Sequence, residues 1–315
     1  MAVVQFPHPG PEHLTDNNGA AFGNAVARNV VIHSGYIPWN DGDHRRKFFS
    51  HKGNYVDSNK QLFQNKNIYF WGEWEAPSKF KHLVCNGPDT PHFGHNQLYA
   101  HDPASYLLNI NPIIPDPPRN SFDYPPNPRL QNTDPYVFGK HFIYSNCRQK
   151  KGSKLLNLAP GSVIFFGSKV NQGFVLDTVF VVEDSKKYLL KMDKGFFTDL
   201  INDGWISETF YNVTIRALQD DPSCDPNQIL VLYKGVTYNN RFKFDGMYSF
   251  FPCSKENTCF ERPHLTSNGI NDNLTRNIKF LDIDPRVAWN NTVDLIHEYG
   301  LQLGVFAEEP QLLIP

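Results

Sequence analysis

The sequence predicts an α+β fold rich in β-strands: a curved antiparallel sheet or pseudo-barrel with few helices and long proline-rich loops. Phe and Tyr are abundant, with 25 and 14 copies in 315 residues, and aromatic side chains favour strands. Two runs, Ser162–Gly167 and Phe174–Val182, are apolar at nearly every position and are joined by a connection of hairpin length. Few segments have the periodicity of a helix.

The two apolar runs predict paired strands that are covered on both faces, because buried strands read as continuous apolar stretches. We expect this pair at the centre of a curved sheet or barrel formed by residues 136–251. Asp177 interrupts the second run, and a carboxylate in a buried strand must be paired or hydrogen-bonded. It is either a structural residue that holds backbone N–H groups or a catalytic residue at a barrel mouth.

The other elements follow from periodicity and from turn residues between the runs. The chain divides into a loop-rich part, residues 1–135, which carries the polar motifs, and a β-rich core, residues 136–315, packed together as one unit. The expected strands are Asn29–His33, Asn67–Glu75, Tyr136–Tyr144, Lys187–Met192, Thr209–Ala217, Gln228–Tyr233 and Gly246–Phe251, and the expected helices are Phe196–Asn202 and Val293–Leu303.

The densest cationic cluster of the chain precedes Phe48 and Phe49. Arg and Lys suit phosphates and aromatic rings stack on bases, so the cluster predicts a ligand-binding segment, with a solvated basic turn as the alternative. If the phenylalanines are buried, at least one Arg turns inward and requires a carboxylate. The cluster consists of His44, Arg45, Arg46 and Lys47.

Two carboxylates follow in a tryptophan-rich stretch. Strand alternation places Trp71, Glu73 and Glu75 on one face, with Trp74 between the carboxylates in sequence. An apolar setting raises a carboxyl pKa, which suits general acid or base catalysis by Glu73 or Glu75. The alternative is an internal ion-pair network with Arg45 and Arg46. In either case we expect this face and the cationic cluster to form one polar site.

Two further segments bear on such a site. Arg262 stands beside a strand exit and is a ligand-binding candidate. The run Phe6–His13 is stiffened by prolines and is either a surface arm or an arm that delivers His8 or His13 to a site.

Composition limits the function classes. The net charge is −2, so no global positive field recruits nucleic acid or membrane. Five scattered cysteines predict free thiols and a cytoplasmic location, and no zinc or other metal site is expected. Neither a signal peptide nor an apolar run long enough to span a membrane is present. The cofactor, protein partners and oligomeric state stay open.

Part of the chain resembles a known superfamily. Leu158-Ala-Pro-Gly-Ser-Val-Ile-Phe-Phe-Gly167, followed by Phe174–Val182, is similar to PUA-like pseudo-barrel domains of the EVE, ASCH and YTH type. The resemblance covers residues 136–192, and Ser162 stands where those domains usually have Asp. It implies an association with nucleic acid or its modification, since such domains bind RNA or modified bases in an aromatic pocket.

Three hypotheses about function follow. The first is recognition of nucleic acid or a modified nucleotide by the β-rich core. The second is an enzyme acting on a nucleotide or nucleic acid, with Glu73 or Glu75 as acid or base and Arg45 and Arg46 holding phosphate. The third is a structural subunit of a larger assembly. Convergence of Arg45, Glu73, Asp177 and Arg262 in one place would favour a single functional site.

Overall fold

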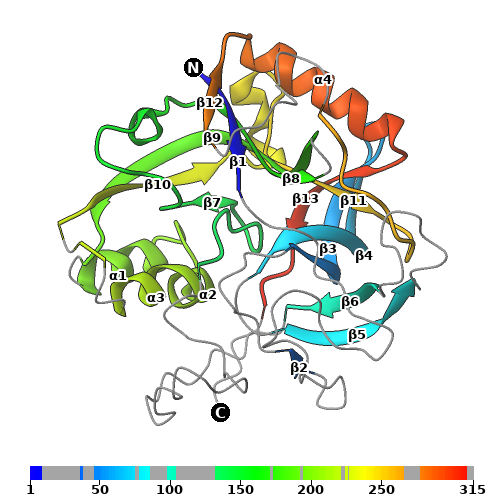
Figure 1. Ribbon diagram of the computed structural model, residues 1–315, viewed down its shortest axis with the longest axis horizontal. Coiled ribbons are helices and arrows are strands. Elements are labelled where there is room, and N and C mark those ends of the chain that lie inside the picture. The colour runs from blue at the N-terminus through cyan, green and yellow to red at the C-terminus, as the bar shows by residue number, and fades with distance from the viewer. Residues whose placement is uncertain are drawn as a thin grey trace.

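The computed structural model of the chain confirms the predicted class, a β-rich α+β fold. It describes residues 1–8, 36–37, 46–74, 78–85, 98–103, 132–170, 173–191, 194–220, 224–225, 227–265 and 277–310. The strands form two sheets, which lie on opposite sides of the molecule in Figure 1. All counts below refer to these residues.

The first sheet has six described strands in the order β12-β1-β8-β9-β10-β7. The predicted hairpin is confirmed at its centre, because β8 and β9 pair antiparallel from Val163↔Val181 to Val170↔Gly173. The N-terminal strand β1 adds to β8 in parallel, which the sequence did not predict. The strands are β1 (Val3–Pro7), β7 (Ile143–Tyr144), β8 (Val163–Val170), β9 (Gly173–Leu189), β10 (Ile229–Gly235) and β12 (Lys279–Leu281).

The second sheet has seven described strands in the order β13-β11-β4-β3-β6-β5-β2. An additional pairing of β13 with β3 closes four of them, β13, β11, β4 and β3, into a small ring. Both sheets therefore combine strands from either side of residue 135. The strands are β2 (Tyr36–Ile37), β3 (Arg46–Val56), β4 (Leu62–Glu73), β5 (Ser78–Cys85), β6 (Leu98–Asp102), β11 (Phe251–Ser254) and β13 (Gln302–Ala307).

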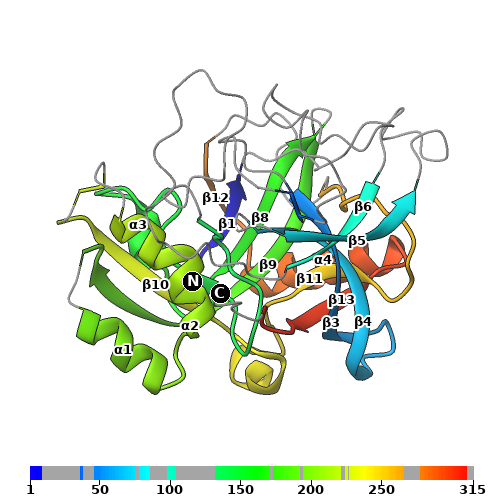
Figure 2. The same cartoon turned by 90° about the horizontal axis from the view of Figure 1, so that it is seen from below.

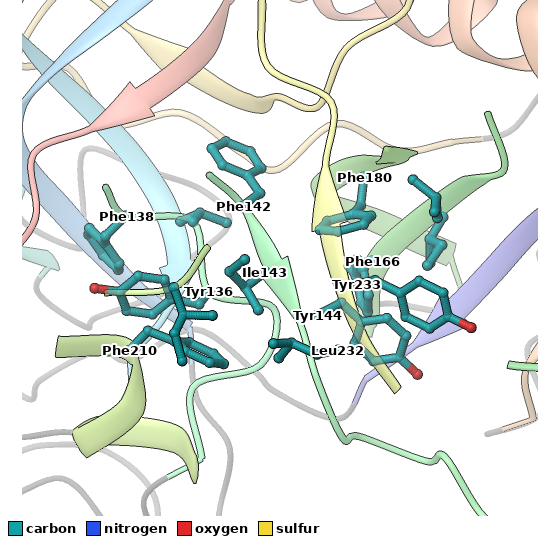
Figure 3. Packing of buried hydrophobic residues seen from close by; sticks show 14 of the residues in the cluster. Tyr136, Phe138, Phe142, Ile143, Tyr144, Phe166, Phe180, Phe210, Leu232 and Tyr233 are labelled. Atoms are coloured by element: carbon teal, nitrogen blue, oxygen red, sulfur yellow. The ribbon is translucent and has the colours of Figure 1, made fainter. Parts of the chain in front are cut away.

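An aromatic core joins the two sheets. Phe6 and Phe166 from the first sheet and Phe70 and Phe251 from the second belong to one buried cluster. Figure 3 shows part of this packing, in which Tyr144, Phe166, Phe180 and Tyr233 lie close together. The rings meet mostly edge to face, for example Tyr144 and Phe166 at 5.2 Å between centroids, an arrangement that the ring quadrupoles favour.

The central hairpin is covered on both faces, as its sequence predicted. Ile164 and Phe166 point into the core between the sheets, while Val163 and Phe165 pack in a second cluster with Trp289 of helix α4. The view in Figure 2 separates the two coverings, with α1, α2 and α3 beside β10 and α4 at the far side of the molecule. The helices are α1 (Lys194–Asn202), α2 (Glu208–Phe210), π-helix η6 (Tyr211–Ile215), α3 (Arg216–Asp220), α4 (Pro285–Glu298), and the 3₁₀-helices η5 (Lys154–Asn157) and η7 (Tyr238–Phe244).

The predicted strand Thr209–Ala217 is wrong, because this segment is helical and runs through α2, η6 and α3. Ser207 caps it by accepting a hydrogen bond from the N–H of Phe210. The alternation of apolar residues was therefore misleading. Four consecutive residues, Asn212 to Ile215, are buried, whereas a strand with one exposed face would bury only every second residue.

Three further predictions needed correction at their ends. The segment Tyr136–Tyr144 folds back as a tight hairpin in which Tyr136 bridges Ile143, since Gly139 has a φ of 77°. The strand expected at Gly246–Phe251 begins only at Phe251. The C-terminal helix starts earlier, after the N-cap Asp284, and stops before Gly300.

Other predicted elements hold or fall outside the described residues. Helix α1 and strand β10 match the predictions at Phe196–Asn202 and Gln228–Tyr233, while Lys187–Met192 is in part the end of β9. The strand expected at Asn29–His33 lies outside the described residues.

Closure of the four-stranded ring depends on Gly53 in β3. A Cβ at this position would lie 2.3 Å from the backbone oxygen of Phe306 in β13 and 2.3 Å from Cδ1 of Ile68 in β4. We therefore expect Gly53→Ala to lower the free energy of unfolding by about 1–3 kcal/mol, since overpacking forces backbone shifts. Urea unfolding measures this.

The matched control is Lys66→Ala, because Lys66 is the exposed cross-strand neighbour of Gly53 in β4. We expect it to change stability by less than about 0.5 kcal/mol. Equal stability of the two variants would show that β3 and β13 do not approach each other as closely as described.

Candidate functional site

Asp177 reaches the space between the sheets because it is the extra residue of a β-bulge. The register of β8 and β9 passes from Phe166↔Thr178 to Gly167↔Leu176 and skips Asp177. A bulge of this kind redirects a side chain and locally breaks the ladder. A Cβ on Gly167 would lie 2.1 Å from the oxygen of Val175, so the absent side chain permits this close approach of the strands.

Arg262 reaches Asp177 through a segment that adds to β9. The N–H of Leu176 donates to the oxygen of Pro263, and the N–H of Leu265 donates to the oxygen of Phe174. Arg262, one residue before this pairing, donates from Nη1 to Oδ1 of Asp177 at 2.7 Å and to the hydroxyl of Ser168. This guanidinium is buried together with its acceptors.

Arg46 joins the second sheet to the same carboxylate. It stands directly opposite Glu73 in the β3–β4 pair, and its Nη2 lies 3.2 Å from Oε2 of Glu73. Its Nε donates to Oδ2 of Asp177 at 2.6 Å. As the sequence predicted, an Arg of the cationic cluster turns inward and meets a carboxylate of the tryptophan-rich stretch. In the part of the chain that the structure describes, two guanidiniums and two carboxylates thus meet in one buried network.

His8 extends this network from the first sheet. The parallel pairing of β1 with β8 continues one residue beyond β1, as the N–H of His8 donates to the oxygen of Gly167. The imidazole Nδ1 lies 3.2 Å from Oε2 of Glu73 and 3.1 Å from Nη2 of Arg46. Only 4 % of His8 is exposed, so these contacts fix the ring.

Cys147 lies at the other nitrogen of this ring. Its Sγ is 3.5 Å from Nε2 of His8 and 3.6 Å from Nδ2 of Asn132. Unlike the ionic network, Cys147 is only partly buried. A thiol, an imidazole and a carboxylate are therefore in line, in the order Cys147, His8, Glu73.

The turn that carries Cys147 is held by a buried carboxylate. Asp134 accepts hydrogen bonds from the backbone N–H groups of Ser145, Asn146 and Cys147, at 2.8, 2.9 and 2.7 Å. Burial raises the pKa of Asp134 to about 7, with a further increase from Glu73, while the three N–H donors act in the opposite direction. The turn is thereby fixed in front of His8.

The tautomer of His8 determines whether Nε2 presents a lone pair or a proton to the thiol of Cys147. If Nδ1 carries the proton and donates to Glu73, Nε2 presents a lone pair to the thiol of Cys147. If Nδ1 instead accepts from Arg46, Nε2 carries the proton. Nη2 of Arg46 makes a hydrogen bond with Nδ1 at 3.1 Å, which belongs to the second arrangement, and the Glu73 carboxylate at 3.2 Å is the acceptor that the first arrangement requires.

The sequence-predicted site residues have different outcomes. Arg46, Glu73, Asp177 and Arg262 converge, with Arg46 in the place that the sequence had suggested for Arg45. Lys47 is fully buried, Trp71 donates to the oxygen of Phe260, and Trp74 packs on Phe138 in the core. The candidates His44, Arg45, Glu75 and His13 lie outside the described residues.

Sequence reasoning missed Cys147, Asp134, Asn132 and Ser168. The proline-stiffened run Phe6–His13 was one signal, since it was considered as an arm that delivers His8 or His13 to a site, but it did not indicate the partner of the imidazole. Nothing local connects Cys147 with His8, which are 139 residues apart.

The described residues contain no group of three or more His, Cys, Asp or Glu side chains that could hold a metal ion. All five cysteines are free thiols, as the sequence predicted. In the part of the chain that the structure describes, no helix is long and apolar enough to cross a membrane.

No family model, curated protein or solved structure matches this chain.

The ionic network makes a clear prediction for stability. Asp177→Asn keeps the shape of the side chain but removes the charge that both buried guanidiniums face. We expect the free energy of unfolding to fall by about 3–5 kcal/mol, the usual cost of removing one partner of a buried ion pair. Denaturant unfolding at constant pH measures the difference.

Asp184→Asn is the matched control, since Asp184 lies on the same strand and is exposed. Its effect is expected to stay within about 0.5 kcal/mol. A loss in Asp177→Asn no larger than in this control would mean that the network does not join the sheets.

Proposed function

We propose that the chain is a thiol-dependent enzyme in which Cys147 is the nucleophile, His8 the base and Glu73 the residue that orients the base. One observation carries the proposal: the two ring nitrogens of His8 contact Sγ of Cys147 at 3.5 Å and Oε2 of Glu73 at 3.2 Å. A nucleophile, a base and an orienting group within hydrogen-bonding reach are typical of covalent catalysis on unrelated folds.

The reaction class is acyl transfer or hydrolysis. His8 Nε2 takes the thiol proton while the sulfur of Cys147 forms a bond to a carbonyl carbon of the substrate. The bond from that carbon to its leaving group then breaks, and His8 returns the proton to the leaving group. Water, deprotonated by His8, attacks the resulting thioester and releases the acid together with the free thiol.

Charge balance supports this chemistry. Among the described residues of the network, the guanidiniums of Arg46 and Arg262 are matched by the carboxylates of Glu73 and Asp177. A thiolate next to an imidazolium is itself neutral as a pair, and forming it does not disturb that balance. Rigid placement of the base also lowers the reorganisation required during the reaction.

A donor for the negative oxygen of the reaction intermediate is present beside the sulfur. The backbone N–H of Cys147 is taken by Asp134, so it cannot serve. Nδ2 of Asn132 lies 3.6 Å from Sγ and also donates to Oδ1 of Asn146 at 2.9 Å, so this amide is a side-chain donor beside the nucleophile. We assign it the role of stabilising that oxygen.

The second candidate is recognition of a nucleotide or nucleic acid, and exposed cations that follow Cys147 in the sequence favour it. Lys150, Lys151 and Lys154 follow Cys147 within one turn-rich segment and are exposed. They suit the phosphates of an anionic ligand better than Arg46 and Lys47, which are 1 % and 0 % exposed. The two candidates are compatible if the substrate of the thiol enzyme is anionic.

The proposal predicts an activated thiol at position 147. In the folded protein, iodoacetamide should alkylate Cys147, whose Sγ contacts Nε2 of His8, faster at pH 7 than Cys224, which is also partly buried. His8→Asn should slow alkylation of Cys147 and leave the rate of Cys224 unchanged, because only the first thiol loses its base. Mass spectrometry of peptides after timed quenching measures both rates.

Catalysis is tested with p-nitrophenyl acetate. We expect Cys147→Ser and His8→Asn to reduce release of p-nitrophenol about 10²–10⁴-fold, the usual contribution of a general base, while Cys224→Ser is unchanged. Thermal melts exclude unfolding as the cause. The proposal would be refuted if Cys147 were alkylated at the same rate as Cys224 and if His8→Asn did not change that rate.

A further inference from the structure

A cavity lies beside the hairpin formed by residues 136–143, and neither His8 nor Cys147 is among its lining residues. Its volume is about 170 Å³, and it is bounded by this hairpin, residues 204–207 after α1, Phe210 of α2 and Glu309 after β13. Pockets for drug-sized ligands are usually about 300 Å³ or larger. This cavity is therefore suited to a single small ring system.

Aromatic side chains form its walls. Tyr136 packs edge to face on both Phe138 and Phe210, with ring centroids 5.6 and 5.4 Å apart. Figure 3 shows these three residues grouped together, and Phe210 is the last residue of α2. Trp205 completes the lining. Rigid aromatic walls favour a ligand with flat apolar faces.

One carboxylate oxygen in the cavity is open to a ligand. Tyr136 and Ser207 both donate from their hydroxyls to Oε1 of Glu309, with a Tyr136 distance of 2.7 Å. No described residue donates to Oε2. A Cβ on residue 139 would lie 3.1 Å from Oε2, so glycine at this position keeps the space beside the oxygen clear.

A second polar atom in the lining is also unused. Nδ1 of His141 is buried and has no hydrogen-bond partner among the described residues. Burial, together with Lys234 and Lys140, lowers the pKa of His141 to about 4, so the ring is neutral at pH 7. A ligand can supply the partner that this nitrogen lacks.

The surrounding charges select among ligands. Lys186 and Lys234 each lie 5.5 Å from the centroid of the Trp205 ring, and Lys140 is an exposed residue of the lining. This positive surrounding disfavours a cation, although an aromatic cage with a carboxylate would otherwise suit one. It favours a neutral ring, and it tolerates an anionic substituent at the rim.

We propose that this cavity binds a planar amino-heterocycle, with its faces against the aromatic walls and a ring N–H or amino group donating to Oε2 of Glu309. The shared chemistry is that of a nucleobase, which can come from a free base or from a nucleotide whose phosphate lies near Lys140. This site is separate from Cys147 and does not depend on the proposed thiol chemistry.

The test is titration of the intact chain with 2-aminopurine, whose fluorescence is quenched when it stacks on aromatic rings. We expect saturable quenching by the wild-type protein. Glu309→Gln should weaken binding at least tenfold, because Tyr136 and Ser207 hold the amide oxygen in the place of Oε1 and leave the amide N–H₂ facing the donor of the ligand. Glu308→Gln, a change at the exposed neighbour, is the control and should leave the affinity unchanged.

A second variant protects the test against misfolding. His141→Leu removes the unpartnered nitrogen without a large change in volume and should weaken binding at least threefold, with thermal melts as the check on folding. Comparison of 2-aminopurine with its nucleoside 5′-monophosphate separates the two sources of the ring. If the monophosphate binds more tightly and the gain depends on Lys140, the ligand is a nucleotide. If the two compounds bind with equal affinity, the ligand is a free base. Absence of saturable quenching by the wild-type protein, or unchanged affinity in both variants, would overturn the proposal.

Discussion

The carboxylate of Asp177 is the interaction on which the arrangement of this molecule depends. One oxygen accepts from Arg46 of the seven-stranded sheet, and the other accepts from Arg262, which is held against the six-stranded sheet. A buried charge of either sign costs several kcal/mol without its partner, so each of these groups is tolerated only because the others are present. The bulge in β9, the segment after Arg262 and the β3–β4 register all serve to bring them together.

The need to pair these buried charges also explains why the candidate catalytic side chains lie together beside Asp177. His8 follows the last residue of β1, Arg46 begins β3, and Glu73 ends β4, so rigid strands deliver all three side chains. Cys147 comes from a turn, but three N–H bonds to buried Asp134 hold that turn. Reactive groups on fixed supports keep their geometry, which a nucleophile and its base require. The ionic network is therefore both the link between the sheets and the support of the His8–Cys147 pair.

Two features of the structure could be predicted from local sequence patterns. Continuous apolar runs correctly predicted the central hairpin, because burial on both faces leaves a direct mark on composition. The pairing of Arg46 with Glu73 was also accessible, since a basic residue beside buried Phe48 and Phe49 must find a carboxylate nearby in sequence.

The incorrect and missing predictions concern features that depend on contacts between residues far apart in the chain. Thr209–Ala217 alternates like a strand, yet a cap at Ser207 and packing against the core make it helical. The parallel addition of β1 to β8, which carries His8 into the network, joins residues about 160 positions apart. No local sequence pattern indicates this strand pairing. The contact between His8 and Cys147 could therefore not be predicted from the sequence.

The account is tested most directly by the tautomer of His8. Nitrogen-15 NMR of histidine-labelled protein at pH 8 can read it in a Cys147→Ala variant, with His8→Asn identifying the His8 signals among the 12 histidines. A base oriented by Glu73 requires a proton on Nδ1 and a bare Nε2. A protonated Nε2, with Nδ1 accepting from Arg46, would contradict the account, because the imidazole would then have no lone pair for the thiol.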